Sequence, residues 1–512
     1  MTPVLHAALA AAPIITVLAL MLGAHWSAAR AGAAGLAVAV ALAVGAFGFG
    51  AGDRQSLGVG LAGVLAEGGF ITATVLWILW PALALYHHQQ HGGALNALRM
   101  ALMRLTARPA LQALLLAWFL ALFLEGAAGF GTPVALVAPL LVGLGFEPRR
   151  AVVLALLGHA TGVSFGALGT PVAAQVALTG LEPGAIAWRT ALLNGAVATV
   201  VMGFFVHALR GATVGAGTDP LPVATWAALA LLAFAVPGIA LALGVGAELP
   251  TLGGALLGGL AFVWAVRRAS GPLDPARAVD RCAMPLPRAL APYGALVILV
   301  IATRAVPPLA DTLREFAVQW RLWDRFEGRM QPLVHPGTLM FAALLLGAAW
   351  QGHAPRSLAP AFAASARRLR PVAIALLAML CLSRLMLHAG MIDALQHAAT
   401  QGLGRAWPLL APAVGALGSF VTGSATASNV LFSTLQVQTA QALGLSAAWM
   451  AAAQGVGAGI GNIVCPHNVV AGAATAGLAG REGEILRSTL VPCVAALVAA
   501  GLIMAVVLGL SG

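Results

Sequence analysis

Two stretches of this sequence decide what kind of protein it encodes, because each interrupts a long apolar segment with residues that are unusual inside membrane helices. Residues 122–182 read LFLEGAAGFGTPVALVAPLLVGLGFEPRRAVVLALLGHATGVSFGALGTPVAAQVALTGLE. Residues 419–479 read SFVTGSATASNVLFSTLQVQTAQALGLSAAWMAAAQGVGAGIGNIVCPHNVVAGAATAGLA. Irregular backbone at membrane depth survives only where it is buried in protein or lines a cavity. The two stretches therefore predict membrane helices that break inside the bilayer.

The breaks come in pairs at corresponding places in two halves of the chain. They are expected at 125–133, 165–171, 422–430 and 461–467. A shift of 297 residues superposes Phe123 and Gly126 on Phe420 and Gly423, and a shift of 295 superposes Gly162, Gly166 and Pro171 on Gly457, Gly461 and Pro466. Because Gly makes up 61 of 512 residues, the shared order of break, half-span and break carries more weight than these identities. This layout predicts a two-repeat secondary transporter, with the four breaks around one polar cavity near the bilayer midplane and a pseudo-two-fold axis between the halves.

The composition agrees with a membrane protein. Apolar residues make up 60% of the chain and charged residues 8%, and the mean hydropathy is +0.93. Soluble domains carry about 25% charged residues, so an ordinary soluble enzyme is excluded. The net charge of +11 comes from short Arg clusters between apolar runs, which indicates membrane topology and not a nucleic-acid partner.

Uninterrupted spans and basic connections define the expected topology. A spanning helix needs about 20 apolar residues, and scaffold spans are expected at 3–24, 30–50, 57–85, 188–209, 223–245, 250–266, 289–306, 333–351, 371–391 and 488–510. The Arg-rich segments 86–108, 267–288 and 352–370 should face the cytoplasm, and 307–332 should be periplasmic and partly helical. The N-terminus has no basic leader, so its apolar run is interpreted as a retained first span. We therefore expect a multi-pass protein of the bacterial cytoplasmic (inner) membrane.

Four motifs carry a resemblance to a known family. They are EGAAGFGTPVAL at 125–136, FGALGTPV at 165–172, GSFVTGSATASNVLFSTLQ at 418–436 and ATAGLAGREGEILRSTL at 474–490. In this order they make the chain similar to the lactate permease family of bacterial monocarboxylate transporters. The resemblance implies uptake of L-lactate, D-lactate or glycolate with protons. It also implies an all-α polytopic fold of two repeats, with discontinuous helices and re-entrant hairpins.

The expected division of the chain follows these repeats. N-terminal scaffold helices should occupy 1–110, the first repeat core 111–266, a connecting segment with scaffold helices 267–370, and the second repeat core 371–512.

The sequence departs from the family pattern at four positions. Family members usually have aspartate where Ala425 stands, lysine where Asn462 stands, glutamine where His467 stands and asparagine where His159 stands. A lone survivor of a buried ion pair would be an unpaired charge, whereas the loss of both partners is tolerated. The joint absence of the acid and the base therefore suggests that positions 425 and 462 are neighbours in the fold. It leaves the exact substrate and the coupling residue open.

Small and hydroxylated residues at the breaks are the candidates for substrate binding. A carboxylate entering the membrane must exchange its hydration shell for donors, and half-helix N-termini offer free N–H groups. Glycine would let the backbone approach the substrate, and hydroxyls and amides would contact its oxygens. The candidates are Gly126, Gly129, Gly131, Thr132, Gly166, Gly169, Thr170, Thr422, Ser424, Thr426, Ser428 and Asn429. The alternative is that these residues only pack helices together.

Glu125 is the first candidate for proton coupling, because it ends the apolar run LQALLLAWFLALFL. An ionisable group at that depth is a functional candidate by default, and burial among neutral groups favours its protonated form. The alternative is a structural acid bonded to backbone N–H groups of the hairpin. His159 and His467 adjoin the breaks and are candidates for a proton relay, against the alternative of neutral hydrogen-bonded side chains.

Arg384 lies in the span CLSRLMLHAGMID and has three interpretations. It could clamp the substrate carboxylate as a bidentate donor, neutralise Glu125, or extend to the membrane surface from a span shifted in register.

No pattern of an enzyme is present in the sequence. Cys282, Cys381, Cys465 and Cys493 are too scattered for a disulfide framework or a metal site. HHQQH at 87–91 is interpreted as a solvated loop and not a metal tract, and GAAGFG at 126–131 does not follow a strand, as a dinucleotide motif would. We expect no cofactor. The partners expected are a small carboxylate, protons and lipid, while the oligomeric state stays open. Transport of another small organic anion and a passive anion channel are the alternative functions.

Overall fold

The computed structural model describes residues 2–24, 26–52, 55–106, 108–129, 132–210, 222–270 and 284–510. Among these residues, 10 helices are long and apolar enough to cross a membrane, or up to 11 if one bent pair counts as a single span. The expected all-helical membrane architecture is therefore confirmed. The predicted cytoplasmic segment 267–288 falls partly outside the described residues.

The scaffold helices match the predicted spans closely. They are α1 (Pro3–Leu22), α2 (Ala28–Gly45), α3 (Leu57–His91), α10 (Pro183–Arg210), α11 (Val223–Gly244), α12 (Pro250–Ser270), α13 (Leu286–Ala305), α15 (Pro336–Trp350), α16 (Ala359–His388) and α22 (Glu482–Leu510). Several of them extend beyond the predicted spans; in particular, α3 continues through 86–91 and α16 begins within the basic segment 352–370. The prediction of a solvated loop at 87–91 is therefore wrong. Gln89 is buried there and donates from Nε2 to the Ala289 carbonyl over 2.7 Å.

The first interrupted stretch forms a hairpin and a bent span. It contains α5 (Pro109–Ala113), a π-helical segment (Leu114–Leu120), α6 (Ala121–Ala127), α7 (Thr132–Gly143), α8 (Pro148–Ala160), a 3-10 turn (Val163–Phe165) and α9 (Gly166–Thr179). The α8 segment and the segment from Val163 to Thr179 are bent by 53° relative to each other. Inside α9, Ala167, Leu168 and Gly169 have left-handed backbone angles, with φ of 42°, 56° and 73°.

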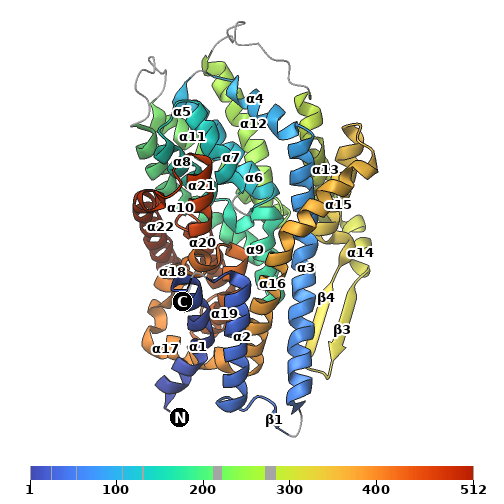
Figure 1. The fold of residues 1–512 in the computed structure, drawn as a ribbon, viewed down its shortest axis with the longest axis vertical. Helices are drawn as coiled ribbons and strands as arrows, with labels where there is room; N and C mark the ends of the chain where they lie inside the picture. The colour runs from blue at the N-terminus through green and yellow to red at the C-terminus, as the bar shows by residue number, and fades with distance from the viewer. Residues whose placement is uncertain are drawn as a thin grey trace.

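The second interrupted stretch follows the same plan. It contains α17 (Met391–Gly402), α18 (Trp407–Thr422), α19 (Ala425–Ala442), α20 (Ala447–Gly461) and α21 (Pro466–Thr475), with a 3-10 turn at Gly404–Ala406. Figure 1 places α5 to α8 in the upper half of the molecule and α17 to α19 in the lower half. The two hairpins therefore approach the middle of the molecule from opposite ends.

The segment predicted to be periplasmic contains a short helix and a feature that was not predicted. Its helix is α14 (Pro307–Glu315), and it is followed by an antiparallel hairpin of β3 (Val318–Leu322) and β4 (Phe326–Met330). Trp323 and Asp324 close the hairpin with positive φ, which suits a tight turn between twisted strands. The remaining elements are α4 (Ala94–Met103), the pair β1 (Ala51–Gly52) and β2 (Gln55–Ser56), and 3-10 turns at Pro332–Val334 and Pro355–Leu358.

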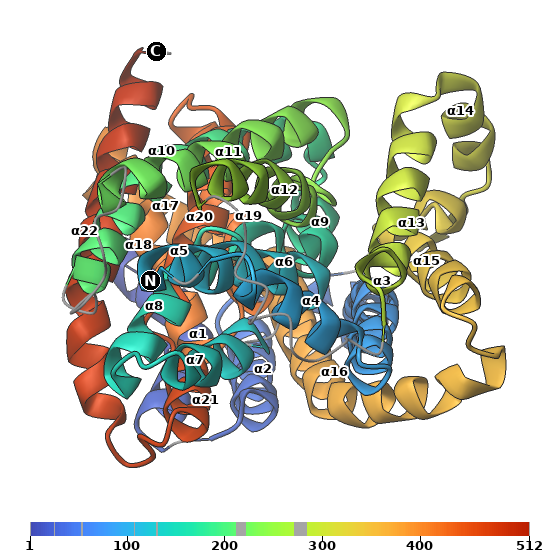
Figure 2. The ribbon, with the colours of Figure 1, turned by 90° about the horizontal axis from the view of Figure 1, so that it is seen from above.

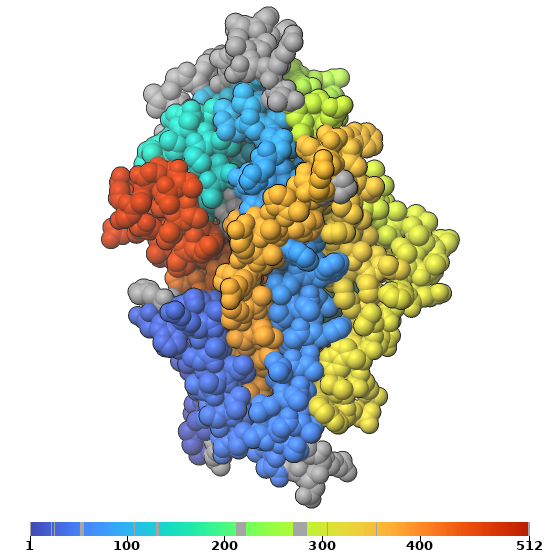
Figure 3. Space-filling view, turned by 45° about the vertical axis from the view of Figure 1, so that its right-hand side comes forward, coloured from blue at the N-terminus to red at the C-terminus, as the bar shows by residue number. Residues whose placement is uncertain are grey.

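The helices α13 to α15 form a separate group beside the main bundle (Figure 2). Figure 2, seen from above, shows α13, α14 and α15 standing apart from the main bundle, on the far side of α3. Figure 3 shows α3 in blue and α16 in orange lying against each other, with the yellow segment of the β3–β4 hairpin at their flank. Small residues permit the close crossings, because a Cβ on Gly68 would lie 2.6 Å from the Cys381 sulfur.

Candidate functional site

All four breaks meet at one small central cavity, which has a volume of about 40 Å³. Its lining residues are Leu79, Glu125, Gly129, His159, Val163, Gly166, Ala167, Thr170, Pro171, Gly423, Ser424, Ala425, Thr426, Asn462 and Asn468. Each predicted break contributes at least one of them. The convergence expected from the sequence is therefore present, and residues far apart along the chain share one polar space.

Glu125 brings the carboxyl group to this cavity. It lies in the last turn of α6, and its side chain is 4% exposed. Gly166 of α9 lies directly against it, since a Cβ at Gly166 would fall 2.3 Å from Glu125 Oε1. Gly129 has a φ of 63° and follows within the same chain reversal. Glycine is therefore required at 166 for the carboxyl to fit where it does.

His159 places an imidazole on the same side of the cavity. Its side chain is 1% exposed, and Nδ1 lies 3.0 Å from the Ala155 carbonyl oxygen. A carbonyl only accepts, so Nδ1 carries the proton in this contact and Nε2 is the remaining acceptor. The cavity therefore contains one carboxyl and one imidazole, two groups that can exchange protons.

The left-handed turn of α9 shapes the cavity wall. Ala167 and Leu168 adopt positive φ although neither is glycine, and such residues cluster at functional sites. The Thr170 hydroxyl donates to the Ala167 carbonyl over 2.6 Å, which holds the turn closed. This backbone arrangement brings Gly166, Ala167 and Thr170 to the cavity in place of a regular helix face.

Neutral polar groups make up the side of the cavity contributed by the second half. Ser424 caps the start of α19 and accepts from the Ala427 N–H over 3.3 Å. Asn468 Nδ2 donates to Asn462 Oδ1 over 3.0 Å, and Asn462 Nδ2 donates to Ser419 Oγ over 2.9 Å. The two asparagines were not among the predicted site residues. Their signal was polarity at membrane depth beside a break.

Ala425 and Asn462 both line the cavity. These are the positions where family members usually carry an acid and a base, and the joint absence of both suggested that they are neighbours. Their presence on one cavity supports that expectation. At these two positions the cavity wall presents a methyl group and an amide, and no Arg is among the described lining residues.

Several predicted site residues serve other contacts. Gly126, Gly169, Thr422, Ser428, Asn429 and Arg384 are not among the lining residues. A Cβ on Gly126 would lie 2.5 Å from the Leu252 backbone, so this glycine permits the crossing of α6 and α12. Ser428 donates to the Gly415 carbonyl over 2.7 Å, and Asn429 donates to the Pro171 carbonyl over 3.0 Å. Asn429 therefore joins the two halves beneath the cavity. Gly131 and the side chain of Thr132 lie outside the described residues.

Arg384 does not pair with Glu125, and that interpretation is wrong. Its Nε lies 3.8 Å from Oε2 of Glu67 on α3, and its Nη2 donates to the Ala177 carbonyl over 2.7 Å. The same Glu67 oxygen lies 2.8 Å from His388 Nε2, and Glu67 Oε1 accepts from the Glu327 N–H over 3.2 Å. The sequence reasoning missed Glu67, although an acid inside the span 57–85 is the same signal that marked Glu125.

His467 is separated from the cavity as well. The residue is exposed and is not part of the cavity lining, although a Cβ on Gly423 would approach its Cβ to 3.4 Å. Of the two predicted relay residues, only His159 faces the cavity.

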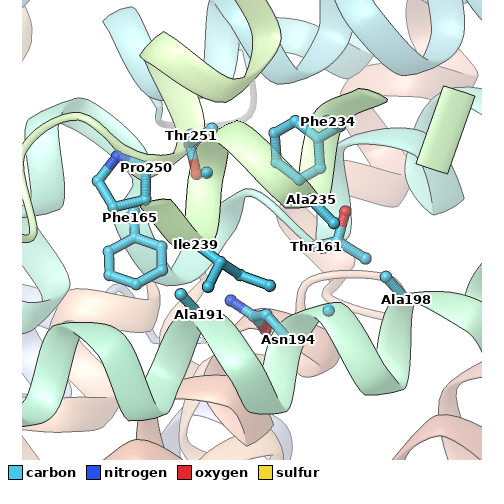
Figure 4. A pocket seen from close by; sticks show the side chains of 12 residues that line it. Thr161, Phe165, Ala191, Asn194, Ala198, Phe234, Ala235, Ile239, Pro250 and Thr251 are labelled. Atoms are coloured by element: carbon cyan, nitrogen blue, oxygen red, sulfur yellow. The ribbon is translucent and has the colours of Figure 1, made fainter. Parts of the chain in front are cut away.

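A second pocket lies beside the bent span, between α10, α11 and α12 (Figure 4). It holds about 20 Å³ and is lined mostly by apolar side chains, such as Phe165 and Ile239. Thr251 donates its hydroxyl to the Gly162 carbonyl over 2.8 Å, which fixes the backbone next to His159. Thr161 and Asn194 add polar atoms to this lining, but the pocket lacks the titratable groups of the central cavity.

Comparisons with known proteins agree with this architecture. A model of the L-lactate permease family matches residues 6–324 and 325–510. The chain belongs to the L-lactate permease family. It is a transporter of the lactate and glycolate permease type and not an enzyme, and it is a multi-pass membrane protein.

Individual members of this permease family match most of the chain. The L-lactate permease of Streptococcus iniae is 29% identical over 396 residues, which cover 74% of this chain and 80% of that protein. The glycolate permease GlcA of Escherichia coli is 28% identical over 484 residues, which cover 84% of each. The solved structure of the YdaH transporter of Alcanivorax borkumensis aligns with a TM-score of 0.54 at 16% identity, covering 93% of this chain and 97% of that one. The last match shows a shared fold.

Proposed function

We propose that this permease carries a short 2-hydroxy monocarboxylate, lactate or glycolate, inward across the bacterial inner membrane together with protons. The observation that carries the proposal is the meeting of all four breaks around Glu125, His159 and a set of neutral donors. The family supports the substrate class, because relatives that match most of the chain are named L-lactate and glycolate permeases.

The cavity suits a small solute. A volume of about 40 Å³ holds about three water molecules, far below the size of a drug-binding pocket. A three-carbon acid would fit only if the breaks moved apart, and alternating access supplies such movement by displacing one repeat against the other. The start of α19 at Ala425, capped by Ser424, offers backbone N–H groups and a favourable dipole to the carboxylate. Thr170 and the two cavity asparagines supply partners for the 2-hydroxyl group.

Proton coupling is assigned to Glu125 within this proposal. Its carboxyl is buried at the cavity, where no Arg of the described chain lines the wall to hold it ionised. His159 is positioned to pass a proton between this carboxyl and the substrate. Arg384 has no coupling or substrate role in this proposal, because its guanidinium contacts Glu67 and the Ala177 carbonyl.

A transport assay in proteoliposomes tests the proposal. The purified protein should accumulate labelled lactate or glycolate against its gradient when the inside is made alkaline, and a protonophore should abolish the accumulation. Equilibration without accumulation would indicate a passive channel. Unlabelled acids added in competition rank the substrates, with short 2-hydroxy acids expected to compete best.

A different small organic anion is the second candidate substrate. The specific observation behind it is the neutral pair Ala425 and Asn462 at the cavity. In the same competition panel, strong inhibition by an acid without a 2-hydroxyl group, together with weak inhibition by lactate and glycolate, would select this alternative.

A further inference from the structure

A second and larger chamber lies between the main bundle and the group of α13 to α15. It has a volume of about 540 Å³ and is bounded by α3, α9, the connection from α11 to α12, α14, β4 and the start of α15. The separation of α13, α14 and α15 from the bundle is visible in Figure 2. The residues of β4 and α14 belong to the segment whose charge pattern predicts a periplasmic location. On that expectation, which follows from the basic segments before and after residues 307–332, the chamber faces the outer side of the membrane.

A thin wall separates this chamber from the central cavity. Ala167 and Thr170 of α9 line the central cavity, whereas Leu168 and Gly169 line the chamber. On α3, Leu79 faces the cavity and its neighbour Ile78 faces the chamber. The left-handed turn of α9 is thus part of both linings, and the two spaces lie on opposite sides of a single layer of residues.

The chamber carries positive charge that its acids do not cancel. Five charged side chains line it, namely Glu182, Glu248, Arg304, Arg314 and Arg329. Glu248 pairs with Arg304, which also donates to the Val334 carbonyl over 3.1 Å. Glu182 accepts from the backbone N–H groups of Gly184 and Ala185 at the start of α10.

Arg314 and Arg329 are left as the exposed cationic groups of the chamber. Arg314 lies on α14 and Arg329 on β4, and both residues are exposed to solvent. A concave space with one excess sign of charge concentrates ions of the opposite sign and speeds their entry. The charge pattern of the chamber therefore selects small anions.

We propose that this chamber is an antechamber that collects small carboxylate anions from the outer side and delivers them to the central cavity through the left-handed turn of α9. The identity of the anion as substrate rests on the proposed function, whereas the capture of anions by the chamber does not. Arg314 and Arg329 attract the anions. Leu168 and Gly169 form the gate between the chamber and the central cavity.

The first arm of the test measures anion capture without any substrate. Ala173, which lines the chamber and is partly exposed, is replaced by Cys in a background with Cys282→Ser. The other three cysteines are buried. In sealed vesicles, the rate of labelling by an external anionic methanethiosulfonate is compared with the rate for a cationic one. The labelling ratio, which is the rate for the anionic reagent divided by the rate for the cationic one, should fall by about tenfold when Arg314→Gln and Arg329→Gln are combined.

The matched control is Arg321→Gln, on the same hairpin. Arg321 carries the same charge but lies outside the chamber lining and contacts Asp324. This change should leave the labelling ratio unchanged. No labelling of Ala173→Cys by either reagent would show that water does not reach the chamber, and an unaltered ratio in the double variant would remove the two arginines from the proposal. Either result overturns it.

The second arm measures transport by the same variants. Loss of Arg314 and Arg329 should raise KM several-fold at low salt and leave kcat near the starting value, and high salt should shrink the difference. A fall in kcat with an unchanged KM would contradict the antechamber. If lactate and glycolate are not transported but the labelling ratio responds as expected, the proposed function fails and the anion antechamber stands. If transport is observed but the labelling ratio does not respond, the antechamber alone fails.

Discussion

Two buried glutamates in this permease have nearly the same burial and opposite surroundings. Glu125 is 4% exposed and Glu67 is 5% exposed, and both lie on membrane-spanning helices. Glu67 is held between His388, Arg384 and a backbone N–H of the β3–β4 hairpin. Glu125 instead faces a small cavity beside Gly166 and His159.

This difference in surroundings is the reason why we propose a coupling role for Glu125 and a structural role for Glu67. Glu67 on α3 contacts Arg384 and His388 of α16 and the Glu327 N–H of the hairpin, so it ties these three elements together. A buried carboxyl at a cavity without such partners can gain and lose a proton as the site opens and closes. Burial of an ionisable residue alone therefore does not identify a coupling residue. The groups that contact the residue must be considered as well.

The largest expected effect is on Glu125. Glu125→Gln should abolish accumulation driven by a pH gradient, because no proton can be released, while exchange of labelled for unlabelled substrate continues at least in part. Uptake and exchange in proteoliposomes measure the two activities separately. Loss of both accumulation and exchange, together with a lowered unfolding temperature, would instead identify Glu125 as a structural acid of the hairpin.

Glu67 provides the converse prediction. Glu67→Gln should lower the free energy of unfolding by about 3–5 kcal/mol, because Arg384 remains buried without its anion. The double variant Glu67→Gln, Arg384→Met should recover most of this loss, and it should still accumulate substrate. Denaturation in detergent measures the stabilities. A stable Glu67→Gln protein that has lost accumulation would transfer the coupling role from Glu125 to Glu67.

Gly166 tests how closely the cavity fits around Glu125. Gly166→Ala places a Cβ within 2.3 Å of the Glu125 carboxyl and should strain the site by about 1–3 kcal/mol. If this strain opposes the substrate-bound state, it corresponds to a loss of apparent affinity of roughly 5- to 150-fold, seen as a raised KM. Gly203→Ala on α10 is the control, because no other group lies within 4 Å of the added methyl group. An equal KM in the two variants would show that the close contact between Gly166 and Glu125 does not affect substrate affinity.

The smallest expected effect concerns the neutral side of the cavity. Ser424→Ala removes the cap of α19 and should cost about 1 kcal/mol of stability, together with a modest rise in KM. Ser446→Ala removes the equivalent cap of α20, where Ser446 accepts from the Trp449 N–H, and that residue does not line the cavity. It should lose similar stability and keep its KM. A matching rise in KM in both variants would mean that Ser424 acts only as a cap.

The sequence alone predicted the spans, because membrane helices depend on local hydrophobicity that is readable within about 20 residues. It also predicted the breaks, since Gly, Pro and polar residues at membrane depth have few structural uses. Glu125, Gly129, His159, Gly166, Thr170, Ser424 and Thr426 were predicted as site residues and line the cavity. The sequence could identify these residues because polar groups and backbone breaks at membrane depth are energetically unfavourable unless the fold uses them.

The tertiary structure decided which residues meet. Arg384 was assigned to the substrate or to Glu125 because both charges were visible in the sequence, but α16 packs on α3 and presents Arg384 to Glu67 instead. The β3–β4 hairpin and the chamber beside it depend on turn geometry and on the spacing of α13 to α15, which no local pattern encodes. The sequence shows which charged residues lie within membrane spans. Only the packing of the helices shows which groups contact them, and these contacts distinguish a residue that stabilises the fold from a candidate for transport.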